Sequence, residues 1–439
     1  MSLVLVVDDC DDFAEMIVEA LALAGHDAVC ASNGRQGLEM ARASTPDVIV
    51  LDGMMPEMGG LEFLERLPNE FSAAPPPVIA MSAYEGYHKL ALERHARAFL
   101  QKPFELKELV QTVDTVVRGR APDRQAAERQ VSHSRAVREQ ESQARDAFLE
   151  HVDLAPDVRA RLGEVTKWVR DYFGFGLAMM SLVKSDVLRV AATFANPSVT
   201  AGDEFEPVIS FCSDLVAGGC PLVLGDSWSH PCFAHRIEAQ RTMRFYAGVP
   251  LKTRAGLPFG TLCVGDSVPR SFFSDDCAIL ECLADPVASY LESIAAGQPS
   301  RLTVFKADDV MDRPAFDAIF SASLRYGART GAITAVATLD LGEVDQANLS
   351  VCGRAAANAA PRVHAVCGML DPSILMLVRQ DPDPRAARDH LEAGVEAVQR
   401  VGRVLRIRTA SYAGADRVMR SVSALDQLAM ELTGAGVEI

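Results

Sequence analysis

The chain has 439 residues, of which 49% are hydrophobic, so it is long enough for roughly three domains with apolar cores. Its formal net charge of −16 and its pI of about 5.1 argue against a nucleic-acid-binding or anionic-membrane protein. The ten cysteines form no CxxC pair, and no apolar stretch approaches the length of a membrane span. We therefore expect a cytoplasmic protein with reduced thiols and no signal peptide at its start, MSLVLVVDD.

Four short apolar runs in the first 120 residues each end at a polar or charged side chain. Apolar runs that alternate with helical patterns predict βα units and a parallel sheet. The ligand site of such a sheet lies outside the carboxyl ends of its strands. Three carboxylates at that edge suit Mg²⁺, and a lysine with a hydroxyl suits a phosphoryl group. The side chains that follow the four runs are, in chain order, Asp8 with Asp9, Asp52, Ser82 and Lys102.

Residues 1–120 resemble the receiver domain of bacterial response regulators, through VVDD at the start, LDGMMPEMGG around Asp52 and KPF at the end. The resemblance implies a doubly wound, flavodoxin-like α/β fold. It also implies that Asp52 accepts a phosphoryl group from a histidine kinase or a phosphotransfer protein. A single acid at a strand end is usually an ordinary loop residue, but five matched residue types in order favour a receiver.

The resemblance also implies a metal site. Asp9, Asp52 and the backbone carbonyl of Met54 would hold Mg²⁺, and Asp8 would act on it through water. A carboxylate can attack phosphorus when a metal neutralises the incoming charge. The implied cofactor is therefore Mg²⁺ at the end of the predicted sheet.

Three further positions carry roles by the same resemblance. Ser82 and Lys102 would contact the phosphoryl oxygens. Lys102-Pro103 resembles the family's cis peptide, since an X-Pro bond prefers trans by only roughly 0.5–1 kcal/mol. Phe99 matches the aromatic switch position of the family, although core packing explains it equally well.

A connecting helix is predicted for residues 121–151, which are mostly polar and lack proline and glycine after Pro122. Gln130 and Glu141 interrupt its heptad pattern, so a strong coiled coil is not expected. We expect a homodimer through the receiver, this helix or the following domain.

Residues 152–295 resemble a GAF domain, which has an α+β fold. Strand patterns flank a turn at Ala255-Gly256, as in a hairpin. GAF domains hold cyclic nucleotides, haem or bilin, or serve in dimerisation and relay, so the resemblance names no ligand. The cysteines of this segment are expected as small apolar core residues: Cys212, Cys220 and Cys263.

Residues 303–439 follow the order helix–strand–strand–helix–strand, which predicts an α/β domain. The segment resembles a GGDEF diguanylate cyclase, with Asp340 at the first metal aspartate. The second acid is replaced by Gly342. The signature turn of the family is replaced by a different sequence, so a degenerate, non-catalytic domain is expected. That sequence is Gly368, Met369, Leu370, Asp371 and Pro372.

The sequence as a whole predicts a two-component response regulator that signals to a downstream protein partner and not to nucleic acid. One alternative is a receiver-controlled diguanylate cyclase, which turnover of GTP with Mg²⁺ would reveal. The other is a small-molecule sensor through the GAF pocket, which a co-purifying nucleotide or a visible absorbance band would reveal.

Overall fold

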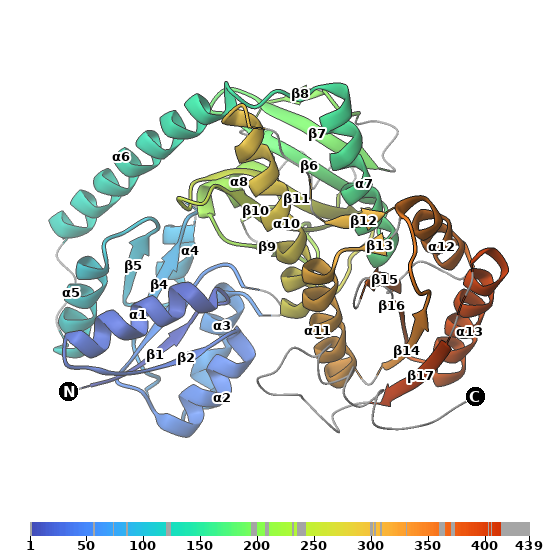
Figure 1. Cartoon of the computed structure of the whole chain (residues 1–439). Helices are drawn as coiled ribbons and strands as arrows, with labels where there is room; N and C mark the ends of the chain where they lie inside the picture. Colours follow the sequence, from blue (N-terminus) through green and yellow to red (C-terminus); the bar gives the residue numbers. More distant parts are fainter. Residues whose placement is uncertain are drawn as a thin grey trace. The chain divides into compact units, whose positions relative to one another are not determined.

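The protein, seen in a computed structural model, folds into two compact units (Figure 1). Unit 1 contains Met1–His151, Ser181–Val190 and Gly202–Ser274, and unit 2 contains the other segments, Val152–Met180, Ala191–Ala201 and Asp275–Ile439. The structure describes residues 2–55, 58–72, 74–84, 87–119, 124–194, 200–206, 210–230, 232–234, 243–298, 302, 304–307, 310–330, 332–359, 365–369, 374–402, 404 and 406–413.

Unit 1 begins with a parallel sheet of five strands, counted within the described residues, in the order β2-β1-β3-β4-β5. The strands are β1 (Leu3–Val7), β2 (Asp27–Ala31), β3 (Val48–Asp52), β4 (Val78–Ser82) and β5 (Ala98–Gln101). The strands inside the sheet are apolar runs buried on both faces, which requires helices on both sides. The predicted flavodoxin-like sheet is therefore confirmed.

Helices cover the two faces of this sheet. Alternate strand residues such as Val4 and Val6 point toward α1 and α5, where they meet Ile17 and Val113. The glycine at position 37 lets α2 approach the other face closely. The helices are α1 (Asp11–Leu23), α2 (Gly34–Ser44), α3 (Gly60–Arg66), α4 (Tyr87–Glu93) and α5 (Leu106–Val117), with the 3₁₀ turn η1 (Leu67–Glu70).

Helix α6 follows over Arg124–Leu149, inside the range for which the sequence predicts a connecting helix. Its 26 residues carry no proline or glycine, and glutamine, glutamate, arginine and alanine favour a helix. The Lys102–Pro103 peptide bond, before α5, is cis as predicted.

A second sheet has the strand order β8-β7-β6-β11-β10-β9 among the described residues. Strands β10 and β11 form an antiparallel hairpin whose turn contains Gly256 at φ +85°, a conformation that favours glycine. Gly260 lies inside β11. The elements are β6 (Leu177–Val183), β7 (Leu188–Phe194), β8 (Glu204–Phe205), α8 (Phe211–Gly218), β9 (Leu222–Leu224), β10 (Phe245–Lys252) and β11 (Pro258–Asp266).

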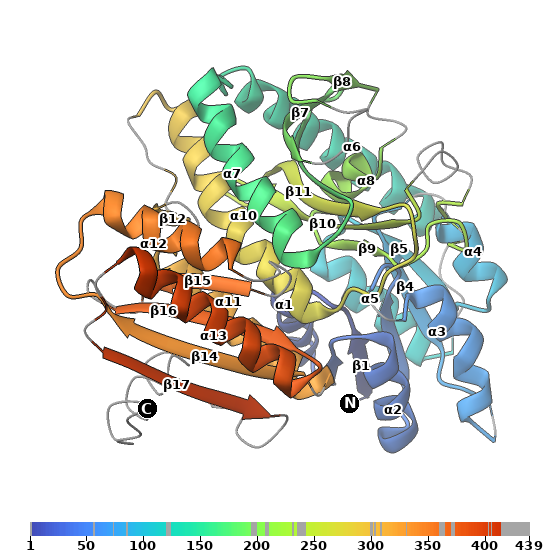
Figure 2. The same cartoon turned by 90° about the vertical axis from the view of Figure 1, so that its right-hand side faces the viewer.

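Unit 2 contains a third sheet, ordered β12-β13-β15-β16-β14-β17 in the part of the chain that is described. Helices α12 and α13 cover one face of it (Figure 2), where Leu349 and Leu391 pack against Leu377. The strands are β12 (Phe305–Ala307), β13 (Val310–Met311), β14 (Ile333–Asp340), β15 (Ala365–Met369), β16 (Ile374–Asp381) and β17 (Arg406–Ala413). The helices of unit 2 are α7 (Pro156–Phe173), α10 (Ser274–Ala295), α11 (Arg313–Thr330), α12 (Gln346–Asn358) and α13 (Pro384–Val401).

One expectation for this segment is wrong, because the predicted order omits α12 and the short strands β12, β13 and β15. Helix α12 follows the N-cap Asp345 and has only weak amphipathic character. Gly368 and Met369 are the last residues of strand β15, where Met369 pairs with Leu375 of β16. The other residues at the position of the family's signature turn lie outside the described residues, namely Leu370, Asp371 and Pro372.

Gly368 is required for packing in unit 2. A Cβ atom at this position would lie 2.3 Å from the ring of the fully buried Phe316 in α11. We expect Gly368→Ala to lower the free energy of unfolding by about 1–3 kcal/mol, as overpacking does. Gly163→Ala is the matched control, because a Cβ on Gly163 of α7 meets no atom within 4 Å. It should stabilise its helix by up to about 1 kcal/mol. Urea unfolding of both variants tests this, and equal effects would contradict it.

Candidate functional site

Side chains from four strand ends of the first sheet meet at its carboxyl edge. Asp52 is the last residue of β3 and Ser82 is the last residue of β4. Lys102 directly follows β5, and Asp8 directly follows β1. Because parallel strands bring their carboxyl ends to one edge, residues that are 94 positions apart come into contact.

Lys102 lies at the centre of this site. Its Nζ donates to Asp52 Oδ1 at 2.6 Å and to Asp8 Oδ2 at 3.0 Å, and it lies 4.4 Å from the ring centroid of Phe13. The other oxygen of Asp52 accepts a hydrogen bond from the backbone N–H of Met54 at 2.6 Å. Both carboxylates are buried, so the lysine supplies the charge partner that buried acids need.

Burial and charge shift the titration of these groups. Burial raises the pKa of Asp52 to about 6, although Lys102 beside it acts in the opposite direction. Burial alone would lower the pKa of Lys102, but the charges of Asp52 and Asp8 outweigh it and hold this pKa well above its usual value. A protonated lysine between two acids is therefore the stable arrangement at neutral pH.

The negative charge of Asp9 is only partly balanced by the positive charge of Lys102. Burial, followed by repulsion from Asp52 and Asp8, raises its pKa well above the usual value, and Lys102 offsets only part of this. Excess negative charge of this kind is what a divalent cation relieves. The carboxylates and the nearby backbone carbonyl are hard oxygen donors, so the donor set fits Mg²⁺.

The Lys102 ammonium holds two of the acids, Asp8 and Asp52, in place. Among the described residues, no three His, Cys, Asp or Glu side chains converge closely enough to hold a metal ion. The Lys102 ammonium lies between Asp8 and Asp52, in the space between their carboxylates. A bound cation would share those oxygens with the lysine.

Ser82 and Phe99 lie beside the acids on neighbouring strands. Ser82 Oγ accepts a hydrogen bond from the backbone N–H of Tyr84 at 3.1 Å, which ties the hydroxyl to the loop after β4. The half-buried ring of Phe99 lies 4.9 Å from that of His88 and 6.3 Å from that of Tyr87, both in α4. Phe99 therefore contacts the helix that follows the Ser82 loop.

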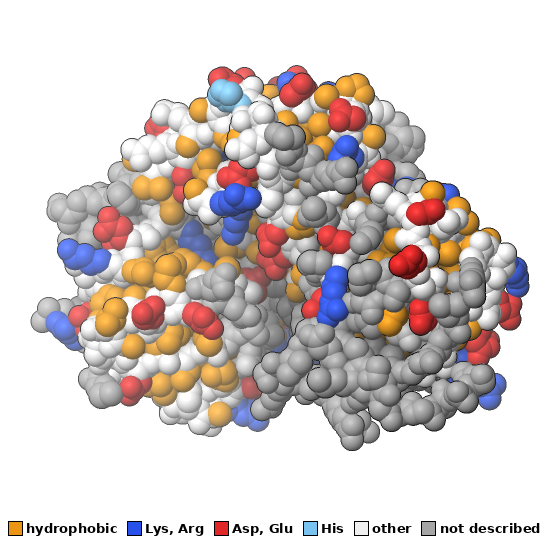
Figure 3. Space-filling model, viewed as in Figure 1, with side chains coloured by type: hydrophobic (Ala, Val, Ile, Leu, Met, Phe, Trp, Pro, Cys, Tyr) orange, Lys and Arg blue, Asp and Glu red, His pale blue; other side chains and the backbone are white. Residues whose placement is uncertain are grey.

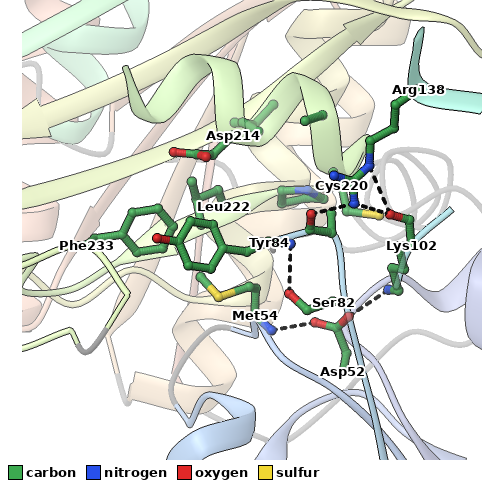
Figure 4. Close-up of a pocket in the computed structure, with 15 residues that line it drawn as sticks. Asp52, Met54, Ser82, Tyr84, Lys102, Arg138, Asp214, Cys220, Leu222 and Phe233 are labelled. Atoms are coloured by element: carbon green, nitrogen blue, oxygen red, sulfur yellow. Dashed lines mark hydrogen bonds and ion pairs between the residues drawn. The ribbon is translucent and has the colours of Figure 1, made fainter. Parts of the chain in front are cut away.

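A cavity of about 270 Å³ within unit 1 opens onto these residues (Figure 4). One wall holds Asp52, Ser82 and Lys102, and the opposite wall comes from α8 and the segment that follows it, including Leu215 and Cys220. The Oη of Tyr84 also donates to the carbonyl of Cys232 at 3.0 Å. Sequence reasoning missed this wall, because no local pattern links residues so far apart.

Helix α6 contacts the same loops from a second direction. Arg138 donates to the carbonyl of Ala83 at 2.7 Å and to that of Lys102 at 3.2 Å. Ser134 Oγ donates to the carbonyl of Gln101 at 2.9 Å. These residues gave no signal in the sequence, since they lie in a uniformly polar helix and bind main-chain atoms.

Comparison with known proteins identifies this segment. The family described as response regulator receiver domain matches residues 4–114. The N-terminal part of the chain is a response regulator receiver domain. It is similar to the regulatory protein AtoC of Escherichia coli, 38% identical over 108 residues that make up 24% of this chain and 23% of that protein.

Other relatives are similar to this chain over the same N-terminal segment. The phosphate regulon transcriptional regulatory protein PhoB of Pseudomonas aeruginosa is 35% identical over 121 residues, which cover 27% of this chain and 53% of that protein. The solved receiver domain of the Francisella response regulator 1452 is 30% identical, covers 27% of this chain and 98% of that chain, and has a TM-score of 0.26. This chain spans about half or less of the length of these curated relatives.

A receiver domain implies a histidine kinase or another phosphodonor as partner, and such domains typically bind Mg²⁺ at the phosphorylation site. None of the helices in the described part of the chain is both long and apolar enough to cross a membrane.

The raised pKa of Asp9 predicts how stability depends on metal and pH. Its folded pKa lies above the unfolded value of about 4, so the stability it contributes is lost as the pH rises through the folded value. In EDTA at pH 7.5, Asp9→Asn should therefore raise Tm. Saturating Mg²⁺ should raise the Tm of the wild type more than that of the variant. Differential scanning fluorimetry measures both, and a variant less stable in EDTA would contradict this account.

Proposed function

We propose that this chain is a two-component response regulator that is phosphorylated on Asp52 and passes the signal to a protein partner. The observation that carries the proposal is the ammonium of Lys102, which lies 2.6 Å from one oxygen of the buried Asp52. Asp52 forms the floor of an open cavity that has room for a phosphoryl group. A carboxylate so placed can act as the nucleophile of a phosphoryl transfer.

The residues at the carboxyl edge of the sheet would have different roles in that phosphoryl transfer. One oxygen of Asp52 would attack phosphorus as the bond to the phosphohistidine nitrogen of the donor breaks. Lys102 would leave one carboxylate and contact a phosphoryl oxygen, and Ser82 would donate its hydroxyl to another. Asp9, Asp52 and the carbonyl of Met54 would hold Mg²⁺, with Asp8 acting through water. The bound ion would neutralise the phosphoryl charge.

The structural change that phosphorylation causes at the carboxyl edge of the sheet would be transmitted to α6 through contacts with main-chain atoms. A rotation of the Ser82 side chain toward a phosphoryl group would break the hydrogen bond that its Oγ accepts from the N–H of Tyr84. The loop after β4 also contains Ala83. Arg138 of α6 donates hydrogen bonds to the carbonyl of Ala83 and to the carbonyl of Lys102. Helix α6 would therefore respond to both loops at once. Phe99 would follow the same movement as the aromatic switch residue.

The second and third segments, residues 152–295 and 303–439, would serve as GAF-like and degenerate GGDEF-like relay domains. The position after Asp340 supports a non-catalytic role, because Gly342 stands where the family has its second acid, and Asp340 Oδ1 accepts the backbone N–H of this glycine at 3.0 Å. Gly368 also supports it, because the ring of Phe316 occupies the space beside this glycine. The homodimer predicted from the sequence fits such a relay and belongs to the same proposal.

Charge supports a protein partner over a nucleic acid. The chain carries a formal net charge of −16. On the face drawn in Figure 3, Lys and Arg side chains stand among Asp and Glu and do not gather in one basic patch. Such a surface lacks the electrostatic attraction on which binding to phosphate backbones depends.

Beryllofluoride tests Asp52 as the phosphoacceptor, because it mimics a phosphoryl group on a carboxylate. With Mg²⁺, the wild type should bind it and Asp52→Ala should not. The matched control is Asp27→Ala, since Asp27 is an exposed acid at the amino-terminal end of β2. Fluorine NMR of the bound species measures the occupancy. Binding by Asp52→Ala equal to that of the wild type would refute the assignment.

Arg138 tests the proposed route through α6. Beryllofluoride should change hydrogen exchange in α6 of the wild type, and Arg138→Ala should bind beryllofluoride but lose most of that change. Arg135→Ala is the control, because Arg135 is exposed on the same helix. Exchange measured by mass spectrometry with and without beryllofluoride decides the point. A full response in Arg138→Ala would exclude this route.

A further inference from the structure

Two cysteines from different elements of the second sheet region lie side by side. Cys212 is in the first turn of α8 and Cys263 is in β11, and their sulfur atoms are 3.9 Å apart. Each residue is only 1% exposed. Gly248 of β10 makes room for the pair, because a Cβ there would lie 2.8 Å from the Cβ of Cys263. The close approach of the thiols is thus built into the packing.

Polar groups surround this pair in an otherwise apolar core. The Oη of the buried Tyr246 donates to Cys212 Sγ at 3.4 Å, and the hydroxyls of Ser181 and Thr261 lie 2.7 Å apart. The hydrogen bond between the two thiols, together with burial, raises the pKa of Cys263. Hydrogen bonding outweighs burial and lowers the pKa of Cys212 to about 6, through the neighbours Cys263, Thr261, Tyr246 and Ser181.

Cys232 shows that burial alone does not produce this environment. It lies in the same unit and is also 1% exposed. Burial raises its pKa to about 12, the opposite direction from Cys212. The two cysteines differ in their neighbours, because hydroxyl groups and a second thiol surround Cys212. Donors around a sulfur atom favour the nucleophilic thiolate.

We propose that Cys212 and Cys263 form a redox-active dithiol, which hydrogen peroxide oxidises to a disulfide. The sulfur of Cys212 attacks one peroxide oxygen, the O–O bond breaks, and the second oxygen leaves as water with the thiol proton. The sulfenic acid so formed is attacked by the sulfur of Cys263, the S–O bond breaks, and a second water leaves. Two thiols lose two electrons, and one peroxide gains them.

The dithiol is connected to the phosphorylation site by α8. Cys212 lies in the first turn of this helix, and Leu215 and Gly218 further along it line the cavity that contains Asp52 and Lys102. A disulfide needs sulfur atoms about 2 Å apart, whereas these lie 3.9 Å apart, so its formation would shift the first turn of α8 against β11 and with it the cavity wall. This consequence rests on the proposed function, whereas the oxidation itself does not.

Peptide mapping of the full chain tests the oxidation. Reduced protein is treated with hydrogen peroxide and digested with trypsin without reductant. Cys263 lies in the tryptic peptide 255–270 and Cys212 in 190–236. We expect these peptides to be linked, with the loss of two hydrogen atoms, and to separate on reduction. The link should also form in Asp52→Ala, so failure of the phosphoacceptor assignment would leave this result unchanged.

Serine variants identify the sulfur atoms. The link should disappear in Cys212→Ser and persist in Cys232→Ser, whose peptide is the same. Tyr246→Phe keeps both thiols and should slow the oxidation roughly fivefold, the effect of one hydrogen bond. A link that survives Cys212→Ser would overturn the proposal. So would the absence of any link at peroxide levels that oxidise the exposed Cys30.

Beryllofluoride binding tests the connection to the site. Oxidised and reduced wild type should differ at least about threefold in affinity, because α8 forms part of the cavity wall. In Cys212→Ser, peroxide should leave the affinity unchanged. Equal affinities of the oxidised and reduced wild type would overturn the connection while leaving the disulfide itself intact.

Discussion

The ion pair of Lys102 with Asp8 and Asp52 is the constraint on which the rest of unit 1 depends. Two acids that are 1% and 5% exposed need a charge partner, since an unpaired buried carboxylate is strongly unfavourable. One ammonium at 2.6 Å and 3.0 Å supplies that partner to both acids. It joins the ends of β1, β3 and β5, so the edge of the sheet is held by charge as well as by main-chain hydrogen bonds.

The ion pairs hold the Lys102 side chain in place, and its main-chain carbonyl accepts a hydrogen bond from α6. Arg138 and Ser134 of α6 bind the carbonyls of Lys102, Ala83 and Gln101, which lie at the ends of β4 and β5. These loops carry the polar side chains of the site. In the proposed function, a charge added at Asp52 would change the partner of the Lys102 ammonium. Helix α6, which binds the same loops, would then respond to that change.

Helix α8 gives the site a second neighbour within unit 1. Its middle lines the cavity above Asp52, and its first turn holds Cys212 against Cys263. Under the two proposals, the phosphorylation site and the dithiol would therefore contact different turns of the same eight-residue helix. In unit 2, by contrast, the glycine at position 368 leaves room for the ring of Phe316.

The sequence by itself determined the receiver. Apart from β2, its strands are apolar runs that end at or directly before a polar or charged residue of the site, so a local pattern was enough to predict the parallel sheet and the edge at which Asp52 and Lys102 meet. Tertiary structure alone decided what surrounds that edge. Arg138 binds carbonyl groups, which no residue type specifies, and the partner of Cys212 is 51 positions away on another element. Such contacts depend on how chain segments pack, and packing of distant segments leaves no period in the sequence.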